Sequence, residues 1–223
     1  MNTSLVAYYK ERAAEYEEIY SKPERQPDLQ HATHILQQTF IGKTVFEIAC
    51  GTGYWTERIA KTATSILATD INAAVLEIAK SKVYAPATVT FELADIFQLP
   101  TYLPFESLFG GFIWSHIPLQ QMNDFLDRVD SLVVPGGTVV FMDNNCVAGS
   151  SLPITHRDQY GNTYQTRQLQ NGKTYEVLKN FPDPNDVKAQ LRDRSTEVNI
   201  ISLTYFWMAI WKKQNGGKTT LRV

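Results

Sequence analysis

Residues 45–53 read Val-Phe-Glu-Ile-Ala-Cys-Gly-Thr-Gly, and this stretch decides the fold. The apolar run over 44–48 predicts a buried strand, and the pattern over 54–61 predicts a helix that begins directly after the second glycine. Gly51 and Gly53 allow the backbone to approach a ligand or to adopt a positive φ. A helix start offers free N–H groups and a positive dipole end, which suit an anionic group such as an amino-acid carboxylate.

Strands and helices alternate around this loop. Helices are expected over the first twenty residues and at about 28–39, 54–61, 73–82, 119–132 and 184–192, and strands at 44–48, 65–69, 89–93, 108–114, 138–142, 197–203 and 205–211. The alternation predicts an α/β fold, a parallel sheet with helices on both faces. Between the last two helices, Asn171-Gly172 predicts a hairpin with a type I′ turn.

The segments together predict a single domain. It has a helical N-terminal extension over 1–40 that could act as a lid, a core over 44–143, a hairpin insertion over 144–182, and a C-terminal helix and strands over 183–212. With 43% hydrophobic and 20% charged residues, the composition is that of a globular protein.

Charge and cysteine content exclude several classes of function. The net charge of −2 lacks the basic excess of a nucleic-acid-binding protein. No apolar run approaches the roughly 18 residues that a membrane span requires, and the N-terminus lacks the apolar core of a signal peptide. The two cysteines have no neighbours at metal-ligand spacing, so neither a bound metal nor a disulfide framework is expected. A cytoplasmic monomer or homodimer is the expectation.

Two aspartates strengthen the interpretation of the glycine loop. Asp70 ends the strand after the loop, where an acidic side chain can accept hydrogen bonds from ribose hydroxyls. Asp95 ends the following strand. Helix N-capping is the alternative role for either residue, and it is plausible for one of them.

These motifs, with Phe-Ile-Trp-Ser-His-Ile-Pro at 112–118 and Val-Pro-Gly-Gly-Thr-Val-Val at 134–140, resemble the class I S-adenosylmethionine (SAM)-dependent methyltransferases. The resemblance covers about residues 44–143 and is greatest to small-molecule enzymes of ubiquinone and menaquinone biosynthesis. It implies a Rossmann-like, seven-stranded, mostly parallel sheet with an antiparallel C-terminal strand.

The resemblance also implies which residues bind SAM. Glu47 would support the turn near the SAM amino group, and the backbone from Ala49 through Cys50, Gly51 and Thr52 to Gly53 would lie along the methionine portion. Asp70 would bind the ribose diol with Ile71 beside the adenine, and Asp95 would bind the adenine amino group with Ile96 against the ring. Trp114 and Ser115 would lie beside the methionine and the sulfonium.

The sequence departs from the family pattern at one position. The family's first glycine is Ala49 here, which we expect to allow binding with a slightly displaced turn. NAD binding, the alternative use of a glycine loop, requires a third glycine where this chain has Thr56, so a dehydrogenase is disfavoured.

His116 follows the fourth strand at the ligand-binding edge and is the candidate general base, with a structural loop role as the equal alternative. Tyr9, Arg12 and Tyr16 in the N-terminal helix and Arg157 and Tyr164 in the insertion are candidate acceptor-binding residues, since arginine and tyrosine can bind a carboxylate or phenolate. The insertion also carries Asn144, Tyr160, Arg167 and Tyr175.

We expect methyl transfer to a small-molecule acceptor. A protein methyltransferase and a catalytically silent SAM-binding module are the alternatives. The motif typical of amino-group methylation in nucleic acids is absent from the end of the fourth strand, where the chain reads Trp-Ser-His-Ile-Pro.

Overall fold

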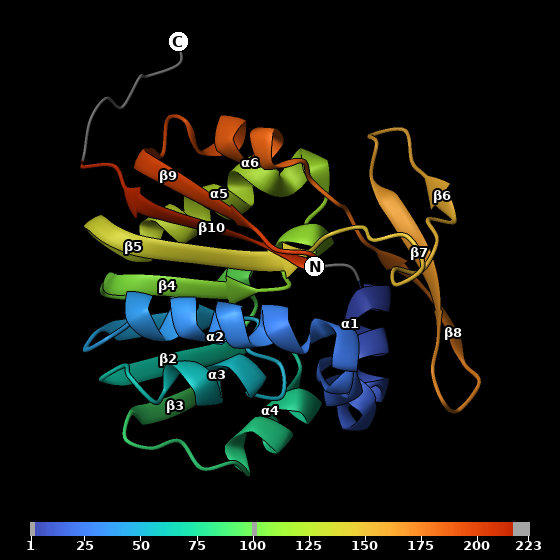
Figure 1. The fold of residues 1–223 in the computed structure, drawn as a ribbon, viewed down its shortest axis with the longest axis horizontal. Helices are drawn as coiled ribbons and strands as arrows, with labels where there is room; N and C mark the ends of the chain where they lie inside the picture. The colour runs from blue at the N-terminus through green and yellow to red at the C-terminus, as the bar shows by residue number, and fades with distance from the viewer. Residues whose placement is uncertain (1–2, 100–101, 216–223) are drawn as a thin grey trace.

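The computed structural model describes residues 3–99 and 102–215. Its centre is a seven-stranded sheet in the order β3-β2-β1-β4-β5-β10-β9 (Figure 1). The strands are β1 Thr44–Ile48, β2 Ser65–Asp70, β3 Thr88–Leu93, β4 Phe105–Gly111, β5 Val133–Asn144, β9 Ser195–Ser202 and β10 Phe206–Lys213. Strands β1 to β5 pair in parallel, and β10 is antiparallel to both neighbours. The predicted Rossmann-like fold is confirmed.

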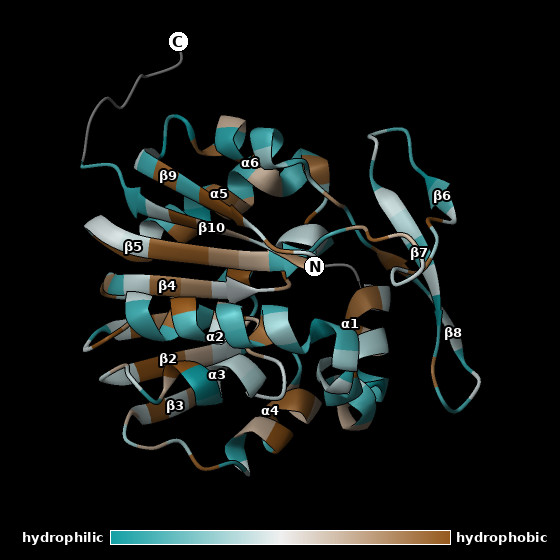
Figure 2. Cartoon of the chain, in the orientation of Figure 1, coloured by the Kyte–Doolittle hydropathy of each residue, from teal (hydrophilic) through white to brown (hydrophobic). Residues whose placement is uncertain are grey.

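Helices cover both faces of this sheet. They are α1 Thr3–Glu11, α2 Gln26–Thr39, α3 Tyr54–Ile59, α4 Ala73–Lys80, α5 Met122–Ser131 and α6 Pro184–Leu191, with 3₁₀ turns η1 Ala13–Ser21, η2 Pro23–Arg25, η3 Ile96–Gln98, η4 Trp114–His116 and η5 Leu119–Gln121. Side chains of α2, α3 and α4 form one apolar cluster with the sheet, and side chains of α5 and α6 form the other. The apolar residues therefore concentrate in the strands, while α2 turns polar residues outward (Figure 2).

The residues after β5 form a second, smaller sheet. It consists of β6 His156–Arg157, β7 Thr163–Gln168 and β8 Thr174–Leu178. Leu5 and Tyr8 of α1 are buried against Leu169 and Val177, so the N-terminal helix and the small sheet pack together. Figure 1 shows both beyond the carboxyl ends of the parallel strands, where open α/β sheets bind ligands.

Three predictions about local structure are wrong. The N-terminal segment is not one helix, because α1 ends at Glu11 and a 3₁₀ turn follows; residues 1–2 lie outside the described chain. Strand β4 begins and ends three residues earlier than expected. The hairpin turn is not type I′, because Gly172 has a φ of +82° but Asn171 lacks the positive φ which that turn also requires. Instead Leu169 N–H donates to the Lys173 carbonyl (2.9 Å) across a longer loop, which lets Leu169 bury its side chain against α1.

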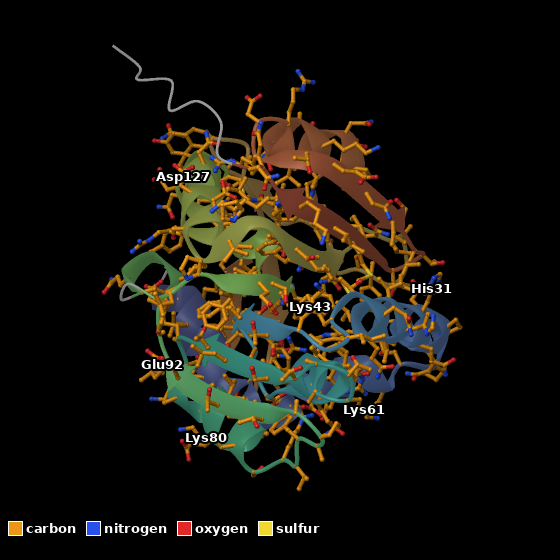
Figure 3. The ribbon with its side chains drawn as sticks, turned by 90° about the vertical axis from the view of Figure 1, so that its left-hand side faces the viewer. His31, Lys43, Lys61, Lys80, Glu92 and Asp127 are labelled. Carbon is orange, nitrogen blue, oxygen red and sulfur yellow. The ribbon has the colours of Figure 1, made fainter. Side chains whose placement is uncertain are left out.

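The edge of the molecule at which the parallel strands begin carries charges of both signs. Figure 3 shows this edge, with the basic residues Lys43, Lys61 and Lys80 and the acidic residues Glu92 and Asp127 labelled. Within the described residues, no helix has the length and apolar character needed to cross a membrane.

Candidate functional site

Two adjoining cavities lie at the carboxyl edge of the large sheet. The smaller has a volume of about 70 Å³ and is lined by the glycine loop, the end of β2 and the N-terminal segment. The larger has a volume of about 630 Å³ and lies between α1, η1, the end of the sheet and the small sheet. Tyr9, Tyr16, Phe112 and His116 line both cavities, and we call these four residues the junction.

The glycine loop has a left-handed backbone at alternate positions. Gly51 and Gly53 have φ values of +57° and +79°, and a Cβ at position 53 would lie 2.2 Å from the Tyr84 hydroxyl oxygen. Ala49 also has a positive φ, +54°, a conformation that is costly for a residue with a Cβ. The turn therefore keeps the backbone course of a glycine loop in spite of Ala49. Ala49 and Gly51 line the smaller cavity.

Asp70 supports the loop from the neighbouring strand. Its carboxylate accepts hydrogen bonds from the backbone N–H groups of Gly51 (2.9 Å) and Asn72 (2.8 Å). Burial raises the pKa of Asp70 to about 6. Asn72, rather than Asp70, caps α4 by accepting from the Ala74 N–H (3.2 Å). Asp70 therefore does not cap α4, so helix N-capping is not its role. Its side chain lines the smaller cavity.

Glu47 lies buried under the same loop at the end of β1. Burial raises the pKa of Glu47 to about 8. Its Oε2 atom is buried and has no hydrogen-bond partner in the described part of the chain. The Thr56 side chain lies beside this carboxyl group, and Glu47 is outside the lining of both cavities.

The structure divides the other predicted cofactor residues into two groups. Ile71 and Ile96 line the smaller cavity. Cys50, Thr52, Gly53 and Asp95 lie outside its lining and support the surrounding turns. Thr52 Oγ donates to a Glu17 carboxylate oxygen (2.6 Å), and Asp95 caps η3 by accepting from the Phe97 N–H (3.0 Å).

The positions of Trp114 and Ser115 differ from the prediction. Because β4 ends at Gly111, residues 111–113 occupy the place beside the cavity that was expected for 114–115. Trp114 instead packs in the core with its ring centroid 5.7 Å from that of Trp207, and the Ser115 N–H donates to Asp143 (2.8 Å). Phe112 at the junction has a φ of +60°, a strained conformation of the kind often found at functional sites.

His116 is a buried member of the junction, with 3% of its surface exposed. Its Nδ1 lies 2.6 Å from the Leu178 carbonyl oxygen, and its Nε2 lies 2.7 Å from the Tyr9 hydroxyl. Since a carbonyl oxygen only accepts, Nδ1 carries the hydrogen and Nε2 accepts from Tyr9. Burial, with the nearby Lys179 and Arg167 charges, holds the pKa of His116 well below its usual value. The ring is therefore neutral and has its basic nitrogen at the junction.

The larger cavity contains some of the predicted acceptor-binding residues. Tyr9, Arg12 and Tyr16 line it, whereas the structure places Arg157 and Tyr164 outside both cavities. Arg157 donates to the Gly161 carbonyl (2.9 Å), and the Tyr164 ring stacks on His156 with centroids 4.4 Å apart. Both side chains therefore make their contacts within the small sheet and its loop.

Several residues of the larger cavity escaped the sequence analysis. Arg25 and Lys179 line it, as does Arg167, which was named only as part of the insertion. Lys179 Nζ donates to Asp143 (2.8 Å) and to Ser115 Oγ (2.6 Å), and this ion pair is almost completely buried. These residues come from distant parts of the chain, so no motif or spacing signals them.

Comparison with known proteins agrees with this arrangement. Residues 45–137 match the family model of a methyltransferase domain. The chain is 25% identical over 129 residues to an uncharacterized methyltransferase of Anoxybacillus flavithermus, a match that covers 56% of this chain and 59% of the relative. It is 26% identical to the malonyl-[acyl-carrier protein] O-methyltransferase of Buchnera aphidicola, with 78% and 63% covered. The chain thus spans about three fifths of the length of these curated relatives.

Solved structures share the whole fold. A DhpI-SAM-HEP complex matches with a TM-score of 0.78 and 24% identity, over 94% of this chain and 98% of that one. The N-methyltransferase NodS from Bradyrhizobium japonicum, in complex with S-adenosylhomocysteine (SAH), matches with a TM-score of 0.67 and 15% identity, over 95% and 99%. The resemblance found in the sequence is confirmed, since residues 45–137 match a methyltransferase domain and the chain shares its fold with solved structures of SAM and SAH complexes.

Proposed function

We propose that this protein transfers a methyl group from SAM to a small-molecule acceptor, with SAM in the smaller cavity and the acceptor in the larger one. The observation that carries the proposal is the junction, where the two cavities share Tyr9, Tyr16, Phe112 and His116. SAM supplies a methyl group on a positively charged sulfur, which a nucleophile displaces in line. Holding the nucleophile close and aligned is the main task left to the protein.

The residues of the smaller cavity fit SAM. Asp70 presents a carboxylate for ribose hydroxyls at the end of β2, and Ile71 and Ile96 provide apolar walls for an adenine ring. The unpartnered Oε2 of Glu47, beneath the loop, is the acceptor that an amino group would satisfy. The solved structures with this fold include SAM and SAH complexes, which supports the assignment.

The N-terminal segment is proposed to be the lid of the cofactor site. Small-molecule sites usually measure about 300–1,000 Å³, well above the 70 Å³ of the smaller cavity. Leu5, Val6, Tyr9 and Tyr16 close it from the α1 side. The lid is held by Asn72 Nδ2, which donates to the Val6 carbonyl (3.1 Å), and by the Thr52 to Glu17 hydrogen bond. Entry of SAM therefore requires α1 and η1 to move, as lids of enzyme sites do.

His116 is proposed as the general base for an acceptor that must lose a proton. Its low pKa keeps it neutral, and its hydrogen bond to Leu178 aims Nε2 at the junction. In the closed structure the Tyr9 hydroxyl occupies Nε2. An acceptor hydroxyl or amine that replaces Tyr9 there would transfer its proton to His116, a contribution typically worth about 10²–10⁴ in rate.

The function is tested with methyl-labelled SAM and metabolite extracts, in which the protein should produce a labelled small molecule. Labelled protein in place of a labelled metabolite would favour a protein acceptor. SAM binding without any labelled product would contradict the proposal and favour a silent binding module. Once an acceptor is identified, His116→Ala should lower kcat by at least about 10² while SAM affinity is retained; unchanged turnover would exclude the base role.

A further inference from the structure

The larger cavity contains arginines that form no ion pair with a carboxylate of residues 3–99 and 102–215. Arg12, Arg25 and Arg167 line it. Among the residues that the structure describes, the ion pairs involve other cations, and none of these three arginines takes part in one. Two lysines, Lys22 and Lys179, also line the cavity, and Lys179 is paired with Asp143.

Arg12 and Arg167 lie on the same aromatic ring. The guanidinium carbon of each is 5.7 Å from the centroid of Tyr8. Arg12 is also 5.5 Å from the centroid of Tyr16, which places it next to the junction. Both guanidinium groups therefore bring positive charge to the part of the cavity wall around Tyr8.

Arg167 and Arg25 each have an unsatisfied buried nitrogen. Arg167 donates through Nη2 to Gln165 (2.9 Å), but its Nε is buried with no hydrogen-bond partner in the described chain. Arg25 donates through Nη2 to Ser150 (3.0 Å), and its Nε is likewise buried and, among the same residues, unpartnered. Both are guanidinium groups, which stay charged in proteins, and the side chains to which they donate, Gln165 and Ser150, are neutral.

Two acidic residues line this cavity as well. Glu15 and Glu18 line it, but Glu15 accepts from the Gln170 N–H (3.3 Å) and Glu18 accepts from Gln170 Nε2 (2.8 Å). Asp143 is held by Lys179. The lining nevertheless has five cationic residues against the two glutamates, so its net charge is positive. Burying unpaired charge is costly, and an anionic ligand is the occupant that offsets this cost.

We propose that the methyl acceptor is a small organic anion whose oxyanion is bound by Arg12 and Arg167, with Arg25 adding positive potential from the far wall. Guanidinium groups present paired N–H donors that match both carboxylate and phosphate oxygens. The position of Arg12 beside Tyr16 would hold the anion within reach of the junction, where the nucleophile meets the methyl group. This inference rests on the proposed function and names its substrate class.

The first test measures anion binding without an acceptor. Calorimetry of the protein saturated with SAH should detect inorganic phosphate and acetate but not neutral acetamide. Arg12→Gln and Arg167→Gln should each weaken phosphate binding by at least about tenfold, because each removes charge-assisted hydrogen bonds. Arg192→Gln is the matched control, since it removes the same charge from an exposed side chain just after α6. Retained SAH affinity in every variant shows that the fold and the cofactor site are intact.

The second test identifies the source of the oxyanion. Carboxylic acids and phosphate monoesters are screened as acceptors beside their amides and alcohols, and turnover of either anionic class above its neutral analogue supports the proposal and names the source. Preference for neutral acceptors, or phosphate affinity that is equal in Arg167→Gln and Arg192→Gln, would overturn it. Failure of SAH to bind the unmodified protein would instead count against the proposed function, so the two failures are distinguishable.

Discussion

The pH dependence of SAM binding follows from the burial of Asp70. Its carboxylate accepts from the Gly51 and Asn72 N–H groups at 2.9 and 2.8 Å and lines the cavity in which SAM is proposed to bind. Burial nevertheless raises its pKa from 3.8 to about 6. In the free protein the folded state therefore holds more protons than the unfolded chain between these values, and stability falls as the pH rises through that window.

SAM binding should have the opposite dependence on pH. Ribose hydroxyls donate to the ionised carboxylate and so favour it over the protonated form. With a pKa of about 6, the ionised fraction falls from about 0.9 at pH 7 to about 0.1 at pH 5, so the affinity should fall about tenfold. Glu47, whose pKa burial raises to about 8, would add a dependence of its own over this range if SAM binds its ionised form, so the contribution of Asp70 is the difference between the wild type and an Asp70 variant.

Calorimetric titration with SAH between pH 5 and 7.5 measures this dependence. Asp70→Asn keeps the side-chain shape but removes the titration of this group, so its affinity should be about 10- to 100-fold weaker at pH 7 and should fall about tenfold less than that of the wild type between pH 7 and 5. A wild-type affinity that does not change over this range would refute the assignment of the ribose to Asp70. So would a variant that retains the full dependence on pH.

Two further predictions concern the contacts that support the site, and urea denaturation measures both. Lys179→Met should lower the free energy of unfolding by about 3–5 kcal/mol, because it leaves the Asp143 carboxylate buried without its cation. The double variant Lys179→Met, Asp143→Asn should lose less. A loss below about 1 kcal/mol for the single variant would contradict the importance of the ion pair. Tyr9→Phe should cost about 1–3 kcal/mol, because it leaves the buried His116 Nε2 without its donor, and an unchanged stability would show that the lid hydrogen bond is absent in solution.

The sequence was sufficient for the architecture because local patterns encode it. The predicted strand at 44–48 and the predicted helix start at Tyr54 are correct to the residue. The glycine turn between them separates a short apolar run, typical of a buried strand, from a pattern with the helical period of 3.6 residues. The end of β4 was misplaced because the apolar side chains of 112–114 continue the strand's pattern into a buried turn. The end of α1 at Glu11 was missed for a similar reason, because the apolar residues of a 3₁₀ turn can lie on one face, as they do in an α-helix.

The acceptor side of the site could be predicted only in part. Tyr9, Arg12 and Tyr16 follow from the apolar face of the N-terminal segment. Arg25 and Lys179 are brought to the same cavity by tertiary packing, and nothing in their local sequence distinguishes them from surface cations. The insertion likewise offered several arginines, and only the packing of α1 on β7 and β8 selects Arg167 over Arg157.

The proposed function requires that SAM occupies the smaller cavity. Calorimetric titration of the purified protein with SAM, and separately with NADH, tests this claim in a single experiment. The account predicts binding of one SAM per chain and no binding of NADH, since Thr56 stands where a dinucleotide loop requires glycine. Binding of NADH with no binding of SAM would contradict it.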